Sequence, residues 1–213
     1  MLFRSAIMVD DGVAHIMCGR ADRNYNGEVD TGDVPASWLM VDVSTHTVLR
    51  TQQFAWQDVH VSRCGMDVAK DVLDISLGNE VVRFNTATQT MLEKLYSGPI
   101  YAVATSPDLQ TVWMSARPGY TEPGAVIEYN TKTKEELRMP VDVNPQQIVH
   151  HTLSNGSMKL VVVCEGDFGM SNGTIHLIDL ESLPRTQTTI SIGDTPNHVA
   201  IANDTAFVTV NGS

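Results

Sequence analysis

The sequence predicts an all-β fold, a β-propeller of four-stranded antiparallel blades. The main reason is a short sequence motif that repeats along the chain, here called the repeated phrase. A β-rich run, an Asp or Asn, a Thr- or Ser-centred turn and a second β-rich run return four times along the chain. The anchors of this phrase are Asp42, Asn85, Asn130 and Asp179. They lie 43, 45 and 49 residues apart, which is the period of a four-stranded blade rather than of a helical repeat.

Turn residues between apolar runs are the second observation. Asp11-Gly12 is a strong hairpin signal, and Ser106-Pro107-Asp108 is a turn because Pro presets φ and Asp caps the turn backbone. The strands predicted for the four blades are 6–9, 13–17, 38–43 and 47–54; 59–62, 72–76, 80–85 and 91–96; 101–105, 111–115, 125–130 and 136–140; and 147–152, 159–164, 174–179 and 186–192. Two further strands, 199–202 and 206–210, begin a fifth blade.

These strands make one β-propeller domain over residues 1–213, with about 4.5 blades. The blade limits are approximately 6–54, 55–97, 98–141, 142–193 and, for the partial blade, 194–213. The last two strands meet a first blade that already has its own inner strands, so nothing remains to close the ring. We therefore expect the natural protein to continue beyond Ser213 by two or three blades, as part of a seven-bladed ring. The alternative is a five-bladed ring with one incomplete blade.

The first residues have two interpretations. Leu2-Phe3-Arg4-Ser5 is the translation of the end of a widely used short-read sequencing adapter, so residues 1–5 are either a non-native artefact or the start of the first strand.

Composition places the chain among ordinary globular proteins and restricts its partners. It has 213 residues, of which 42% are hydrophobic and 18% charged, with a formal net charge of −11. This charge repels phosphate backbones, so we expect no nucleic-acid partner. No stretch approaches the roughly 18 apolar residues of a transmembrane helix, so no transmembrane segment is expected. The cysteines Cys18, Cys64 and Cys164 are odd in number and predict buried thiols rather than a disulfide framework.

The cycle of inner strand, Ser-Pro-Asp turn, Gly-x-Val-x-x-Ile-Asp and Thr-x-Thr turn resembles the YVTN or surface-layer type of propeller repeat. Gly193-Asp-Thr-Pro-Asn-His-Val-Ala-Ile201 and Phe207-Val-Thr-Val-Asn-Gly212 carry the resemblance most closely. Val163-Cys-Glu-Gly-Asp-Phe-Gly-Met-Ser-Asn-Gly-Thr174 also resembles a hairpin of a group of bacterial surface propellers, although Cys164 stands where that pattern has Asn. The resemblance implies a bacterial, extracytoplasmic protein that is periplasmic, secreted or attached to the cell surface.

The sharpest local motif has the spacing of a calcium loop. Oxygen-bearing side chains fall at positions 1, 3, 5, 9 and 12, with Gly27 at position 6; they are Asp22, Asn24, Asn26, Asp30 and Asp33, and Glu28 would add its backbone carbonyl at position 7. The motif resembles the dockerin loop and the calcium hairpins of integrin-type propellers, and its setting between two strands fits the second better. We expect structural calcium here. The alternative is a polar hairpin whose Asn and Asp side chains only satisfy turn backbone.

A second candidate site comes from aligning the inner strands. The residues just before their apolar runs are Asp58, Tyr101, Gln147 and His198. Propeller geometry brings equivalent inner-strand positions together at the mouth of the central channel, so these residues form the expected ligand-binding site. The alternative is that they are only a solvated channel rim.

The chain lacks the patterns of most enzyme classes. It has no Cys-x-x-Cys-His, no Gly-x-Ser-x-Gly and no phosphate-binding Gly-rich loop. The favoured function is a non-enzymatic binding or scaffold propeller with a calcium-stabilised hairpin, and the expected partner is a small molecule, a glycan or a protein at the channel mouth. The alternatives are a propeller enzyme of lactonase or quinoprotein dehydrogenase type, with its site at the central channel, and a structural surface-layer component.

Overall fold

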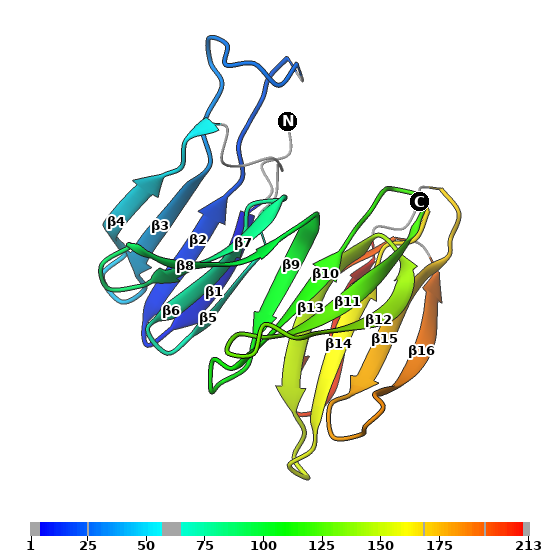
Figure 1. Cartoon of the computed structure of the whole chain (residues 1–213). Coiled ribbons are helices and arrows are strands. Elements are labelled where there is room, and N and C mark those ends of the chain that lie inside the picture. Colours follow the sequence, from blue (N-terminus) through cyan, green and yellow to red (C-terminus); the bar gives the residue numbers. More distant parts are fainter. Residues whose placement is uncertain (1–4, 25, 57–64, 168, 194, 211–213) are drawn as a thin grey trace. The chain divides into compact units, whose positions relative to one another are not determined.

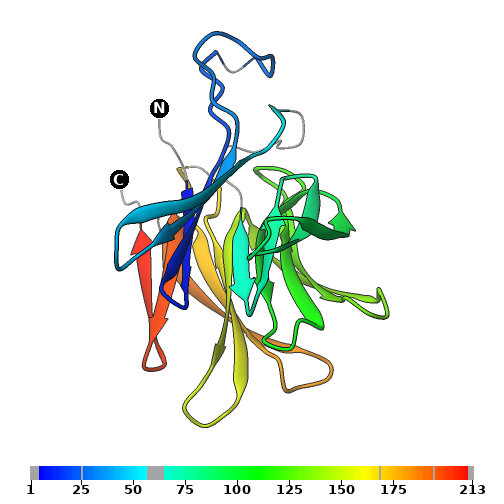
Figure 2. The ribbon, with the colours of Figure 1, turned by 90° about the vertical axis from the view of Figure 1, so that its left-hand side faces the viewer.

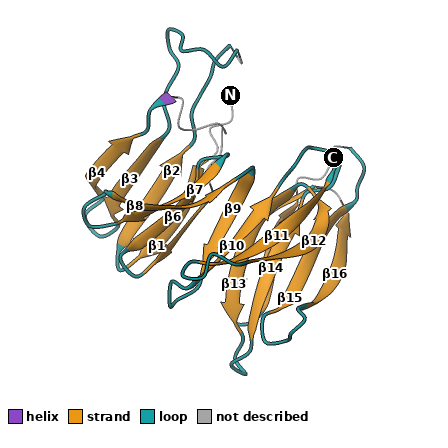
Figure 3. Ribbon diagram, in the orientation of Figure 1, coloured by secondary structure: helices purple, strands orange, loops and turns teal. Residues whose placement is uncertain are grey.

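The computed structural model describes residues 5–24, 26–56, 65–167, 169–193 and 195–210. Within these residues the regular structure is almost entirely β-strand (Figure 3). The described part contains no helix that is long and apolar enough to cross a membrane. The chain divides into two compact units, unit 1 over Met1–Gly98 and unit 2 over Pro99–Ser213.

Unit 1 consists of two four-stranded antiparallel sheets, each with its strands in sequence order (Figure 1). The first contains β1 (Ser5–Asp10), β2 (Val13–Cys18), β3 (Ser37–Asp42) and β4 (Thr47–Gln53). The second contains β5 (Met66–Ala69), β6 (Val72–Ser76), β7 (Glu80–Asn85) and β8 (Met91–Ser97). Each sheet has the strand order of a propeller blade.

Unit 2 repeats this arrangement twice and adds a hairpin. Its first sheet contains β9 (Ile100–Thr105), β10 (Thr111–Ala116), β11 (Pro123–Asn130) and β12 (Glu136–Val143). Its second contains β13 (Pro145–Thr152), β14 (Met158–Cys164), β15 (Gly173–Asp179) and β16 (Thr186–Gly193). The hairpin is β17 (Pro196–Ala202) and β18 (Thr205–Val210), and it lies beside β13 and β14 (red in Figure 2). The prediction of an all-β propeller built from four-stranded antiparallel blades is confirmed.

One strand lies elsewhere than the sequence predicted. The first strand of the second blade was expected at 59–62, which falls outside the described residues, whereas the strand that pairs with β6 is β5, Met66–Ala69. Only Lys70 and Asp71 connect β5 to β6, and Lys70 has a φ of 56°. A two-residue hairpin requires positive φ, which Gly and Asn adopt most readily. Lys gives a weak turn signal, and the sequence therefore did not reveal this hairpin.

The turn of the repeated phrase is shaped by hydrogen bonds that the anchor side chain accepts. Oδ1 of Asp42 accepts hydrogen bonds from the backbone N–H groups of Ser44 (2.8 Å) and Thr45 (2.9 Å), which makes an Asx turn. Oδ1 of Asn85 and of Asn130 accepts the backbone N–H three residues further on, at 2.8 and 2.9 Å. The residue after each of these turns has positive φ: His46 at 57°, Gln89 at 56° and Lys134 at 63°. Asp and Asn are interchangeable as anchors because both supply the required Oδ1.

The core of unit 1 packs the first blade against the second. Trp38 is fully buried in this core, and its ring centroid lies 5.9 Å from the ring centroid of Phe84. Nε1–H of Trp38 donates a hydrogen bond of 3.3 Å to Nδ1 of the buried His15. The other core residues come from both sheets: Met17, Ala36, Met40, Phe54, Met66, Leu73, Ile75, Leu77 and Val82.

A buried ion pair crosses the second blade from β6 to β7. Asp74 is fully buried and Arg83 is 6% exposed. Nε of Arg83 donates to Oδ1 of Asp74 and Nη2 donates to Oδ2, both at 2.8 Å. The two residues face each other in the antiparallel register, so the backbone pairing holds the bidentate geometry.

Two glycines of unit 2 allow consecutive blades to approach closely. A Cβ on Gly124, in β11, would lie 2.7 Å from the ring of Pro145 at the start of β13. A Cβ on Gly173, in β15, would overlap the ring of Pro196 at the start of β17. This contact explains why a Gly lies at or next to the start of the third strand in both blades, and it positions the start of each following inner strand.

The prediction of buried thiols is confirmed for Cys164 and only partly met by Cys18. Cys18 is half-buried and Cys164 is buried, and neither forms a disulfide. Burial, and secondarily the nearby Asp142, raises the pKa of the Cys164 thiol to about 12, so this thiol stays protonated and unreactive. Cys64 lies outside the described residues.

Candidate functional sites

The calcium-like loop connects β2 to β3 and extends beyond the end of their sheet (Figure 1). A single antiparallel bridge closes its base, in which the N–H groups of Ala21 and Val34 donate to each other's carbonyls at 2.8 and 3.0 Å. Of the loop residues, Tyr25 alone lies outside the described residues. The bridge fixes both ends of the loop, so the predicted ligands belong to one closed turn.

Within the loop, side-chain oxygens accept hydrogen bonds from backbone N–H groups. Oδ2 of Asp22 accepts from Gly27 at 2.7 Å, and Oδ1 of Asn26 accepts from Glu28 at 2.9 Å. Gly27 has a φ of 81°, the conformation that the motif requires of Gly at its sixth position. Oδ1 of Asp33 accepts from the N–H of Arg23, at 2.8 Å. These bonds wrap the chain around the predicted ligands.

Asp30 lies at the centre of the loop's side-chain contacts. Its Oδ2 accepts hydrogen bonds from Nδ2 of Asn24 (2.9 Å) and Nδ2 of Asn26 (2.8 Å), which lower the pKa of the Asp30 carboxyl. Among the described residues, no three His, Cys, Asp or Glu side chains lie close enough together to hold a metal ion. A cation in the loop would therefore need the carboxylates of Asp22, Asp30 and Asp33 to come closer together than they lie here. It would also need the amides of Asn24 and Asn26 to turn their oxygens inward, in place of their nitrogens.

Two side chains outside the motif brace the loop. Nε1–H of Trp56 donates a 2.9 Å hydrogen bond to the carbonyl of Gly27, and the guanidinium of Arg20 lies 4.7 Å from the Trp56 ring centroid. Arg20 also donates to the Trp56 carbonyl, at 3.3 Å. Sequence reasoning gave Trp56 no role here, because it is far along the chain from the loop.

Three of the four predicted channel-mouth residues lie in the described part of the chain. Asp58 lies outside the described residues, and β5 begins eight residues after it, so Asp58 does not directly precede the strand that pairs with β6. Tyr101, Gln147 and His198 all lie in unit 2, on the inner strands β9, β13 and β17. These strands are spatial neighbours, β9 beside β13 and β13 beside β17. The structure thus brings three of the four predicted strand positions onto adjacent strands.

Their register differs from the predicted alignment by one residue. Gln147 and His198 each follow an extra residue, Gln146 and Asn197, where the strand pairing shifts. The N–H of His198 donates a 3.1 Å hydrogen bond to the hydroxyl of Thr209 on β18. In β9 the N–H of Ala102 makes the equivalent 2.8 Å bond, to the hydroxyl of Ser115 on β10. Tyr101 therefore corresponds to Gln146 and Asn197 rather than to Gln147 and His198. The sequence alignment did not predict this one-residue register shift, because a β-bulge has no strong sequence pattern.

Gln147 and His198 differ in exposure and in role. Oε1 of Gln147 accepts a 2.7 Å hydrogen bond from the N–H of Val199, so this side chain links β13 to β17. His198 is exposed. Gln147 is half-buried, and its side chain joins two inner strands.

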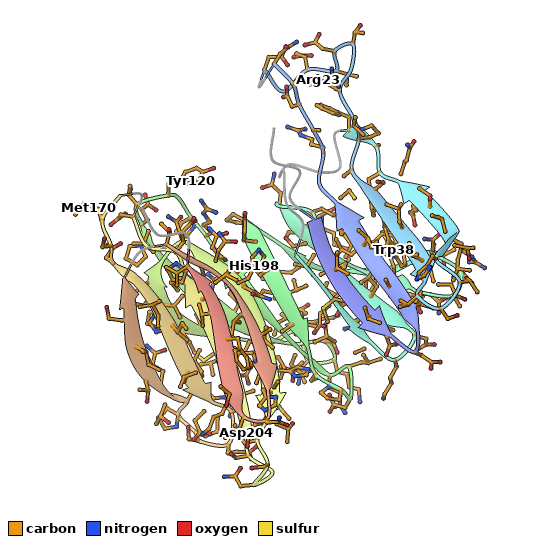
Figure 4. All side chains as sticks on the ribbon, turned by 180° about the vertical axis from the view of Figure 1, so that it is seen from behind. Arg23, Trp38, Tyr120, Met170, His198 and Asp204 are labelled. Atoms are coloured by element: carbon orange, nitrogen blue, oxygen red, sulfur yellow. The ribbon has the colours of Figure 1, made fainter. Side chains whose placement is uncertain are left out.

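Tyr101 belongs to a stack that sequence reasoning missed. The guanidinium of Arg117 lies 4.9 Å from the Tyr101 ring centroid and 4.3 Å from that of Tyr120. Tyr120 is 77% exposed and lies at one end of unit 2 (Figure 4). Among the described residues no carboxylate pairs with Arg117. The only available signal was the Arg117-Pro-Gly-Tyr120 segment, whose turn residues bring the two side chains together.

A cavity of about 320 Å³ lies between the fourth blade and the β17–β18 hairpin. Asp204, which lines it, marks the end of unit 2 away from Tyr120 (Figure 4). Two polar pairs border the cavity: Nε2 of His151 lies 2.9 Å from Oδ1 of Asp204, and Lys159 pairs with Asp179 at 2.6 Å. Hydrogen bonds from Ser154, and secondarily from His151, lower the pKa of Asp204 to about 2. The rest of the lining is Leu153, Val161, Leu177, Thr186, Thr188, Ile201 and Ala206.

Comparisons with known proteins show the fold alone. The chain matches no protein-family model and no curated protein. A solved chain of the Kuenenia stuttgartiensis hydrazine synthase is 11% identical with a TM-score of 0.65, covering 97% of this chain and 61% of that one. A chain of the nidogen/laminin complex is 9% identical with a TM-score of 0.67, covering 98% of this chain and 71% of that one. The chain thus spans less than two thirds of the hydrazine synthase chain, and these likenesses support a β-propeller without indicating its role.

Proposed function

We propose that this protein is a ligand-binding propeller module whose ligand binds on Arg117 and Tyr120. The observation that carries the proposal is the guanidinium of Arg117, which lies 4.9 and 4.3 Å from two tyrosine ring centroids and has no carboxylate partner among the described residues. Structural arginines elsewhere in unit 2 pair with carboxylates; Arg185, for example, donates two hydrogen bonds to Glu128, at 3.1 and 2.7 Å. Arg117 instead keeps its donors available while stacking fixes its orientation.

The chemistry of the stack indicates the kind of ligand. A guanidinium fork recognises a carboxylate through two parallel hydrogen bonds. The exposed ring of Tyr120 offers an apolar face on which a sugar ring can pack. An acidic glycan combines both features, so among the small-molecule, glycan and protein partners predicted from sequence we favour a carboxylate-bearing glycan.

Removing the Arg117 side chain is expected to weaken binding of galacturonate oligomers roughly 10- to 100-fold, since a hydrogen bond to a charged group contributes about 1.5–3 kcal/mol. Titration calorimetry with these oligomers and with their methyl esters measures this. Arg138, which is exposed and paired with Glu136 at 3.3 Å, supplies the control variant Arg138→Ala. Equal affinity for acid and ester, or for wild type and Arg117→Ala, would count against the proposal, as would the absence of binding.

We also propose that the loop over Asp22–Asp33 binds calcium as a structural ion. The ligand spacing, the φ of Gly27 and the closed base of the loop support this. The carboxylates of Asp22, Asp30 and Asp33 and the oxygens of Asn24 and Asn26 would hold the ion. Such a site, with three carboxylates, suits the higher calcium concentrations found outside the cytoplasm, which supports an extracytoplasmic location.

Calcium is expected to raise the melting temperature of the protein. At about 100 times its Kd, the ion adds about 2.7 kcal/mol, which corresponds to a rise of roughly 5–10 °C for a chain of this size. Differential scanning calorimetry with calcium and with EGTA measures the shift. The variant Asp22→Ala/Asp30→Ala should lose most of it, while Asp11→Asn, a charge change in an exposed turn, should keep it. A calcium response that is the same in all three proteins would exclude the loop as the site.

A further inference from the structure

Asn144 is the single residue between β12 and β13, where the chain passes from the third blade to the fourth. It is 4% exposed and has a φ of 56°. Its Nδ2 donates hydrogen bonds to the carbonyls of Tyr120 and Gly166, both at 2.8 Å, and its own carbonyl accepts the N–H of Glu165 at 2.9 Å. One side chain therefore joins the loop between β10 and β11, which carries Tyr120, to the loop between β14 and β15.

These two hydrogen bonds define the orientation of the Asn144 amide. If the amide were turned over, its oxygen would face two carbonyl oxygens, and none of the three atoms could donate. In the observed orientation Oδ1 is buried and accepts no hydrogen bond from the described residues. A buried acceptor without a donor lowers stability. The double donation by Nδ2 is therefore the contribution that explains an amide at this position.

The propeller fold does not require an amide at this point. Asn144 directly precedes Pro145, and the equivalent residue before Pro196, at the start of β17, is Thr195. Thr195 also has positive φ, at 30°. A threonine hydroxyl carries one hydrogen-bond donor, so it cannot make the two bonds that the Asn144 amide makes. The amide belongs to one passage between blades, and a role in the fold alone does not account for it.

The Arg117–Tyr120 segment is attached at both ends. The N–H of Arg117 donates to the carbonyl of Pro99 at 3.1 Å, and the carbonyl of Tyr120 accepts the bond from Asn144. Between these attachments the Arg117 guanidinium lies 4.3 Å from the Tyr120 ring centroid. Because Tyr120 is 77% exposed, packing contributes little to the position of its ring. Among the described contacts, the bond from Asn144 is then the main restraint at this end of the segment.

We propose that Asn144 is a positioning residue for the ligand site on Arg117 and Tyr120. It holds the Tyr120 ring over the Arg117 guanidinium by tying the loop of the third blade to the loop of the fourth. A ligand then meets a stack that is already in place, so less conformational entropy is lost on binding. That the stack binds a ligand rests on the proposed function above, whereas the effect of Asn144 on the stack does not.

The first test observes the stack without a ligand, by NMR of the full ¹⁵N-labelled chain. Aromatic rings shift the signals of protons near their faces, so the Nε–Hε signal of Arg117, assigned from its loss in Arg117→Lys, reports the position of the Tyr120 ring. Asn144→Gly should move this signal in the same direction as Tyr120→Ala does. Glycine adopts positive φ freely, so the substitution removes the amide without straining the backbone.

Asn203→Gly is the matched control, because Asn203 also has positive φ, at 47°, but lies exposed in the turn between β17 and β18. It should leave the Arg117 signal at its wild-type position. Asn144→Asp keeps the shape of the side chain and removes both donors, so it should act as Asn144→Gly does and decides the question if the glycine variant does not fold. An unmoved Arg117 signal in a folded Asn144 variant would overturn the proposal.

The second test measures binding of galacturonate oligomers by titration calorimetry. Asn144→Gly should weaken binding roughly 3- to 10-fold, the range that one well-placed aromatic contact accounts for. Asn203→Gly should bind as the wild type does. Equal affinity of Asn144→Gly and the wild type would show that Asn144 does not position the ligand site. If the wild type itself does not bind these oligomers, the proposed function fails, and the Arg117 signal alone decides whether Asn144 positions the stack.

Discussion

Replacing Arg83 with leucine is expected to lower the free energy of unfolding by about 3–5 kcal/mol. The change would leave the carboxylate of Asp74 fully buried without the two 2.8 Å hydrogen bonds that compensate it. Urea denaturation followed by tryptophan fluorescence measures the loss. We attribute the loss to the buried charge of Asp74, which loses its bidentate partner, and not to lost packing, since leucine fills much of the space of the arginine stem.

The double variant Asp74→Leu/Arg83→Leu distinguishes these causes. Because it removes both charges, it should recover most of the stability lost in the single variant. The control Arg138→Leu removes an exposed arginine paired with Glu136 at 3.3 Å and should cost less than about 1 kcal/mol. If the double variant were as unstable as Arg83→Leu, the loss of stability would come from lost packing and not from the uncompensated charge of Asp74.

Truncating Trp38 to alanine is expected to cost about 3–5 kcal/mol, the usual range for an aromatic residue in a core. Trp38 is fully buried, packs against Phe84 and donates to His15. Its loss opens a cavity between the two sheets of unit 1 and leaves the buried Nδ1 of His15 without its donor. The midpoint of urea unfolding, followed by far-UV circular dichroism, measures the effect.

Trp38→Phe separates the two contributions. It keeps most of the packing and removes the hydrogen bond, so its cost should lie well below that of Trp38→Ala. Tyr120→Ala, at a position 77% exposed, should change stability by no more than about 0.5 kcal/mol. A loss below about 1 kcal/mol for Trp38→Ala would contradict the position of Trp38 at the centre of this core.

The candidate sites show how far sequence reasoning reaches. The Asp22–Asp33 loop could be found because all its proposed ligands lie within twelve residues at a spacing set by the ion. The Arg117 and Tyr120 stack was missed because its third member, Tyr101, comes from another part of the blade.

Sequence by itself determined the blade repeat, because its signals are local. The side chains of Asp42, Asn85 and Asn130 close turns within a few residues, and alternating apolar residues mark the strands between them. Tertiary structure decided the inner-strand register and the position of β5. A β-bulge and a two-residue turn at Lys70 depend on how strands pair and not on strong local preferences. It also decided which polar groups are buried without partners, because burial and hydrogen bonding arise only when distant segments pack together.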